Sequence, residues 1–125
     1  MTEETREAGA KLQHKMMGGP EVATHSGSEN PADFVANFVQ EHIFGELWQR
    51  DVIDLRTRSL CTIAAIVACR GSEDALKNHV RGALANGATR DQILEVVVHT
   101  AVYSGFPVLP SAMRASREAI EEYES

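Results

Sequence analysis

His79 is the residue whose type and position most directly suggest proton-transfer chemistry. It interrupts an apolar helical line formed by Leu76, Val80, Ala83 and Leu84. An imidazole among apolar side chains loses solvation and needs polar partners, and it titrates near physiological pH. His79 is therefore either a general acid–base group or a core histidine that is hydrogen-bonded to a carbonyl group.

A second candidate group consists of Glu95, His99 and Tyr103, which follow one another at intervals of four residues. On a helix this spacing puts the three side chains on the same side. The glutamate would then fix the tautomer of the imidazole for acid–base work. The same three residues would equally suit a buried polar seam between helices.

Two further residue sets have a possible binding role. His42 and Glu46 lie four residues apart, like half of a metal site, but no further ligand pair lies near them in the sequence, and we expect no metal. Arg58 has a planar fork of donors that suits a substrate carboxylate. It would also suit an ion pair with Glu46 or Glu95.

The element that must position most of these groups is the apolar run Leu60–Cys69, which lacks Gly and Pro. A helix that is apolar nearly all round must be buried on most sides. Asp54 can cap its start, and Gly71 can supply the left-handed residue that ends it. Because Arg56 and Arg58 lie in its first turns, a membrane span is not expected. We predict that this is the central helix of a helical core.

Capping residues, chain breakers and apolar spacing predict five more helices. They run from about Glu4 to Met17, from Asn30 to about Trp48, from Ser72 to the stop at Asn86 and Gly87, from about Arg90 to Ser104, and from Pro110 onward. Thr89 and Gln92 read as a capping box. The stretch Glu21–Asn30 has no period and is predicted to be an extended loop. No strand pattern is found, so the predicted fold class is all-α.

Composition bounds the function. With 125 residues and 43% hydrophobic content, the chain suits one domain, and its net charge of −6 without a basic cluster makes nucleic-acid binding unexpected. Glu3, Glu4 and Arg6 are followed by no apolar run, so we expect no secretory signal and a cytoplasmic protein.

Cys61 and Cys69 are eight residues apart on one predicted helix, about 12 Å along its axis. This distance is too long for a disulfide between them within that helix.

Several stretches together resemble a known family. They are Phe44–Arg50 (FGELWQR), Arg56–Leu60 (RTRSL), His79, Asn86–Gly87 and His99–Pro107 (HTAVYSGFP). Their order and spacing are similar to those of 4-carboxymuconolactone decarboxylases, over about 33–118. The resemblance implies a single all-α domain over residues 1–125, an alkylhydroperoxidase D-like bundle of about six helices, in which residues 1–30 form an N-terminal helix and loop. Departures from the family pattern at Asp51, Leu55 and Ala75 concern the substrate rather than the fold.

The resemblance also implies a reaction, the cofactor-independent decarboxylation of a small carboxylated lactone. The family substrate is a butenolide with a carboxylate on the ring carbon beside the ring oxygen. Losing carbon dioxide leaves a carbanion that is delocalised onto the lactone carbonyl as a dienolate. The protein must then anchor carboxylates, donate a hydrogen bond to the enolate oxygen and protonate carbon.

By resemblance, the catalytic residues are His79, His99, Glu46 and Tyr103, and the substrate-binding residues are Arg58, Arg81 and Trp48. No metal or other cofactor is implied. The implied partners are a small carboxylated lactone and further copies of the chain, as a trimer or hexamer, with no nucleic acid or membrane. Two alternatives stay open: a related proton-transfer enzyme, such as a lactone isomerase or hydrolase, and a non-catalytic helical oligomer that binds a small acid.

The superfamily has another branch, similar to disulfide reductases that serve peroxidases. That branch needs a CxxC motif just before the histidine and a glutamate near the start of the central helix. Here Ser72–Asn78 contains no cysteine, and Ser59 stands near the place of the glutamate. Because dithiol exchange needs a second thiol within reach of the first, this chemistry is not expected.

Overall fold

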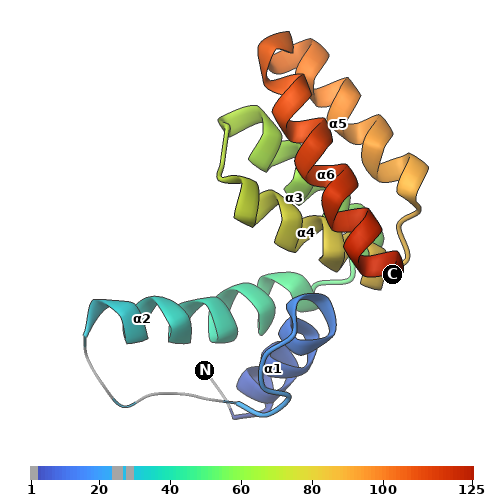
Figure 1. Ribbon diagram of the computed structural model, residues 1–125. Coiled ribbons are helices and arrows are strands. Elements are labelled where there is room, and N and C mark those ends of the chain that lie inside the picture. The colour runs from blue at the N-terminus through green and yellow to red at the C-terminus, as the bar shows by residue number, and fades with distance from the viewer. Residues whose placement is uncertain (1–2, 24–26, 28–29) are drawn as a thin grey trace. The chain divides into compact units, whose positions relative to one another are not determined.

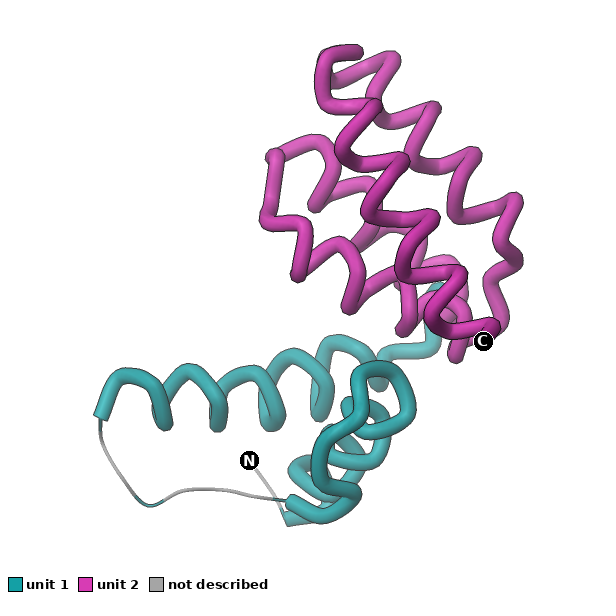
Figure 2. The backbone as a smooth tube through the Cα atoms, in the orientation of Figure 1, with its two compact units in different colours: residues 1–53 teal, residues 54–125 magenta. Residues whose placement is uncertain are grey.

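The computed structural model describes residues 3–23, 27 and 30–125, which form six α-helices and no strand (Figure 1). The prediction of an all-α, alkylhydroperoxidase D-like bundle of about six helices is confirmed. The chain divides into two compact units, residues 1–53 and 54–125 (Figure 2). The single domain over residues 1–125 stays a prediction. None of the described helices is both long and apolar enough to cross a membrane.

The first unit consists of α1 (Glu3–Met17), α2 (Pro31–Phe38), the π-helix η1 (Val39–Phe44) and the 3₁₀ turn η2 (Leu47–Gln49). α1 packs on η1 and η2. The core of this first unit contains Leu12, Met16, Phe44 and Trp48. Asn30 caps α2 by accepting a hydrogen bond from the backbone N–H of Asp33, as predicted. The loop predicted over Glu21–Asn30 lies partly outside the described residues.

Two glycines make the contact between α1 and η1 possible. A Cβ atom at Gly9 would lie 2.8 Å from the backbone nitrogen of Gly45, and a Cβ at Gly45 would lie 2.6 Å from the carbonyl oxygen of Thr5. Both distances are shorter than a real Cβ contact. Backbone atoms therefore approach each other where α1 crosses η1, because neither position carries a side chain.

The helix predicted from Asn30 to Trp48 is wrong in its second half. α2 ends at Phe38, the chain continues as a π-helix to Phe44, and a 3₁₀ turn holds Trp48. The wider π-turn rotates the following residues away from the α-helical stripe. Of the apolar residues whose helical spacing supported this prediction, Phe34 is 65% and Phe38 46% exposed, whereas Ile43 is partly buried.

The second unit is a bundle of four helices, α3 (Leu55–Cys69), α4 (Glu73–Ala85), α5 (Arg90–Ser104) and α6 (Leu109–Glu124), with a 3₁₀ turn η3 (Phe106–Val108) before α6. α3 packs on α4 and α5, and α6 packs on α4 and α5. Asp54, Ser72 and Thr89 cap the first three helices through their side-chain oxygens, and Thr89 forms the predicted capping box with Gln92.

The core of this unit is aliphatic, and its fully buried side chains include Ile63, Val80, Ile93, Val97 and Ile120. One buried polar link crosses it. The side-chain amide nitrogen of Asn86 donates to the hydroxyl of Ser59 over 3.0 Å and so joins the end of α4 to the start of α3. Ser59 is fully buried, and this bond satisfies its oxygen.

Two expectations about α3 are corrected. Of its residues only Ser59, Ile63 and Val67 are buried, and Cys61 and Cys69 are exposed, because the packing of α4 and α5 on α3 leaves part of its surface uncovered. Its last turn ends at Arg70, not Gly71, in the left-handed conformation with φ of 57°. The backbone nitrogen of Gly71 then closes the turn on the carbonyl of Ile66 at 2.9 Å.

Candidate functional site

A groove of about 410 Å³ runs between α3 and α5. Its lining is apolar apart from two hydroxyls, a thiol, a carboxylate and an imidazole, and consists of Thr57, Leu60, Cys61, Ala64, Glu95, Val96, His99 and Thr100. This volume lies in the range of small-molecule sites, and an apolar lining with a few polar groups is typical of them. The groove is therefore the candidate ligand site of the second unit.

The predicted stripe of Glu95, His99 and Tyr103 forms on one side of α5. The ring centroids of His99 and Tyr103 lie 5.0 Å apart, and Glu95 and His99 both line the groove. All three side chains are exposed, so the interpretation as a buried polar seam is wrong for the described chain. An acid, a base and a phenol hydroxyl are thus presented next to an apolar groove.

His79 lies on α4, beside the buried residues Leu76 and Val80, and is itself half-buried. Burial lowers the pKa of the His79 imidazole, because desolvation disfavours the charged form. At neutral pH the free protein therefore holds His79 in the uncharged form.

The stability of the protein should depend on pH through His79. In the unfolded chain a histidine titrates near its ordinary pKa of 6.5, whereas burial lowers the pKa in the folded chain. As the pH falls below 6.5, the unfolded state binds the proton more readily, so the free energy of unfolding decreases. Urea titrations between about pH 5 and 7 should show a shallower pH slope for His79→Gln than for the wild type. Equal slopes would contradict the contribution of His79.

The predicted carboxylate anchors differ in their surroundings. Arg58 is half-buried in the first turns of α3, next to the groove residue Thr57. Arg81 on α4 donates to the side chains of Asn78, at 2.8 Å, and Glu122 on α6, at 3.0 Å. This guanidinium lowers the pKa of the Glu122 carboxyl. Arg81 therefore has protein partners on α4 and α6.

The other two predicted site residues belong to the first unit. Glu46 follows η1 and accepts a hydrogen bond from Nδ1 of His42 over 2.5 Å, so the suggested half of a metal site is a histidine–glutamate pair. Across the part of the chain that the structure describes, no three His, Cys, Asp or Glu residues are grouped to hold a metal. Trp48 is 4% exposed and packs on Phe44 with ring centroids 5.6 Å apart.

The structure thus brings His99 and Tyr103 together and places His79, Arg58 and Arg81 on neighbouring helices of the same unit. Sequence reasoning missed Cys61 as a lining residue of the groove. Its spacing from Thr57 and from Ala64, four and three residues, is the signal that these side chains share one helix side. Because Cys61 lies in the apolar run Leu60–Cys69, which indicated a helix buried on most sides, this spacing was not interpreted as a groove lining.

Comparison with known proteins shows the family to which this chain is related. The sequence pattern of the carboxymuconolactone decarboxylase family matches residues 35–118. The chain belongs to this family. A 4-carboxymuconolactone decarboxylase from Acinetobacter baylyi is 33% identical over 126 residues, which cover 98% of this chain and 92% of that protein. A nitrosuccinic acid decarboxylase from Metarhizium robertsii is 32% identical over 117 residues, 91% of this chain and 80% of that protein.

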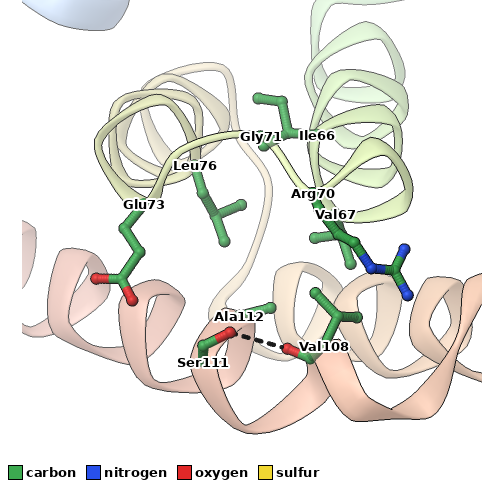
Figure 3. Close-up of a pocket in the computed structure, with 9 residues that line it drawn as sticks. All are labelled: Ile66, Val67, Arg70, Gly71, Glu73, Leu76, Val108, Ser111 and Ala112. Atoms are coloured by element: carbon green, nitrogen blue, oxygen red, sulfur yellow. Dashed lines mark hydrogen bonds between the residues drawn. The ribbon is translucent and has the colours of Figure 1, made fainter.

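In this member of the carboxymuconolactone decarboxylase family, a second cavity lies where α3, α4 and α6 meet (Figure 3). It holds only about 30 Å³. Figure 3 shows the Arg70 guanidinium and the Glu73 carboxylate on opposite sides of it, while Leu76 and Val67 lie between them. One or two waters would fill this space. The cavity is too small for a lactone, so of these two cavities of the second unit only the α3–α5 groove has room for one.

The cysteines of this family member should not support peroxidase chemistry. Cys61 and Cys69 are both free thiols on α3, about 12 Å apart along the helix, so neither can resolve an oxidised partner within one chain. Thiol-dependent peroxide consumption should equal a buffer control, as measured by loss of hydrogen peroxide with dithiothreitol. Robust turnover that disappears in the double variant Cys61→Ala, Cys69→Ala would assign the protein to the redox branch of the superfamily.

Proposed function

We propose that the protein is a cofactor-independent decarboxylase of a small carboxylated lactone similar to 4-carboxymuconolactone. The observation that carries this proposal is the family match over residues 35–118, which includes His79, Arg58 and the groove residues of α3 and α5. The names of the two relatives add support, because each describes the loss of carbon dioxide from a carboxylic acid.

The two relatives' substrates have one chemical property in common. A lactone carbonyl and a nitro group can each accept the negative charge that remains when carbon dioxide leaves. The substrate therefore provides its own electron sink, and the protein has to bind carboxylates, stabilise developing oxyanion charge and supply a proton. Apolar walls such as Leu60 and Val96 would favour the conversion of a carboxylate into neutral carbon dioxide.

His79 is the proposed proton donor to carbon. Its lowered pKa keeps it neutral in the free protein, and a bound substrate carboxylate would raise that pKa, so that His79 takes up a proton from solvent when the substrate binds. Arg58 or Arg81 would anchor a carboxylate. His99 or Tyr103 would donate to the enolate oxygen. Roles for Glu46 in catalysis and Trp48 in substrate binding rest on the family resemblance.

We further propose a cytoplasmic enzyme of aromatic catabolism that works as a homo-oligomer, a trimer or hexamer by resemblance. The chain leaves large apolar side chains on its surface: Val102 is 58% exposed, Phe106 60% and Phe34 65%. A chain of this size rarely exposes so many unless another chain covers them. Sedimentation at micromolar concentration should give a trimer or hexamer mass, and a monomer would contradict the proposal.

The decisive experiment is a carbon dioxide release assay across a panel of carboxylated lactones, with protein treated beforehand with a chelator. The proposal predicts stoichiometric carbon dioxide from at least one member of the panel, at a rate that the chelator does not change. Consumption of a lactone without carbon dioxide would instead identify a lactone isomerase or hydrolase. Saturable binding without turnover would identify a non-catalytic acid-binding protein.

A further inference from the structure

Three reactive groups line the α3–α5 groove together: the thiol of Cys61, the imidazole of His99 and the carboxylate of Glu95. Cys61 is exposed, so a ligand in the groove can reach its sulfur. The remaining lining includes Leu60, Ala64 and Val96, which offer an apolar surface to a small ring. A nucleophile, a proton carrier and an apolar wall in one cavity are the components of a covalent binding site.

We propose that this groove captures small conjugated lactones covalently, through addition of the Cys61 thiol to the ring double bond. The choice of ligand class rests on the proposed function, because a butenolide whose double bond is conjugated with its carbonyl is a soft electrophile. The thiolate is the soft nucleophile that matches it. Capture would make the enzyme sensitive to accumulated unsaturated lactone, since an adduct at Cys61 occupies the groove beside His99.

The addition step is balanced without an oxidant or a reductant. His99 accepts the thiol proton, and Sγ of Cys61 forms a bond to the ring carbon β to the carbonyl. The electron pair of the double bond moves toward the carbonyl and forms an enolate, which then receives the proton at the α-carbon. The net change is addition of S–H across the carbon–carbon double bond. The protein gains the full mass of the lactone.

Cys69 provides an internal comparison. It lies on the same helix as Cys61 and is also exposed, but it does not line the groove. Its only hydrogen bond within the described chain is a long one of 3.7 Å to the carbonyl oxygen of Ile66. A difference in lactone reactivity between these two thiols therefore measures the groove, not cysteine exposure in general.

The test uses the full-length protein with 2(5H)-furanone, a conjugated lactone without a carboxylate, and with iodoacetamide as a small reagent that needs no apolar site. Peptide mass spectrometry would follow both cysteines over time. We expect furanone to modify Cys61 about tenfold or more faster than Cys69, whereas iodoacetamide should modify the two within about threefold. Equal furanone rates, or a Cys61 that neither reagent modifies because a second copy covers it, would overturn the proposal.

Variants separate the groove from general thiol reactivity. His99→Gln should slow furanone addition at Cys61 and leave the rate at Cys69 unchanged, and Cys61→Ser should abolish the fast adduct. A Cys61 rate that is indifferent to His99 would contradict the assigned proton transfer. The readout is a mass, not turnover, so the two proposals fail separately. Carbon dioxide release without a Cys61 adduct sinks only this inference, and an adduct without carbon dioxide release sinks only the decarboxylase.

Discussion

Replacing His79 with glutamine should lower kcat for decarboxylation by about 100-fold or more, the usual scale for a lost general acid–base group. Glutamine keeps a polar side chain of similar length beside Leu76 and Val80 but cannot carry the proton. Because His79 is only half-buried, the melting temperature should change little. Steady-state carbon dioxide release and thermal unfolding of the same preparation measure the two quantities.

The control for this variant is His14→Gln. His14 is a histidine of α1 whose Nε2 lies 3.2 Å from Oε1 of Glu21, and it has no proposed part in the reaction. Its replacement should leave kcat unchanged. If His79→Gln retains activity but unfolds at a much lower temperature, His79 is a core histidine, and the proton must come from another group such as His99.

Replacing Gly45 with alanine should destabilise the first unit by about 3 kcal/mol, at the upper end of the cost of overpacking. The new Cβ would lie 2.6 Å from the carbonyl oxygen of Thr5, and a backbone atom of α1 cannot move aside without moving the helix. We expect α1 to lose its packing on η1. Hydrogen exchange of the α1 amides should accelerate strongly.

Gly27→Ala is the matched control, because no atom of the described residues lies within 4 Å of the position that its Cβ would occupy. Exchange of the α1 amides should be unchanged in that variant. Gly9→Ala tests the same contact from the other helix and should resemble Gly45→Ala. Wild-type exchange rates in both Gly9→Ala and Gly45→Ala would show that α1 does not depend on this close approach.

Local signals in the sequence predicted much of the fold because they act within a few residues. The caps at Asn30, Asp54, Ser72 and Thr89 each satisfy a free backbone N–H of the first helical turn, whatever the rest of the chain does. The bounds of α5 follow from its capping box and from Gly105 at its end. The family was likewise predictable from its short sequence motifs, and the all-α class from the helical spacing of apolar residues.

Burial was harder to predict, because it depends on which elements cover a face. The apolar run Leu60–Cys69 indicated a helix buried on most sides, but α4 and α5 cover only part of α3 and leave Cys61 exposed. For the same reason the groove was not predicted. Helical spacing put Glu95 and His99 on one side of α5, but no local pattern indicates that this side lies next to Cys61 of another helix.

The π-helix η1 has a consequence for how length changes would act in this family. A π-turn accommodates about one more residue than an α-turn, which turns everything after it by about 100° relative to what precedes it. Deleting one residue between Val39 and Phe44 would restore an unbroken α-helix and rotate Glu46 and Trp48 to other directions. A one-residue insertion or deletion within η1 can therefore change which side chains of the first unit lie on its surface, even when the rest of the amino-acid sequence is unchanged.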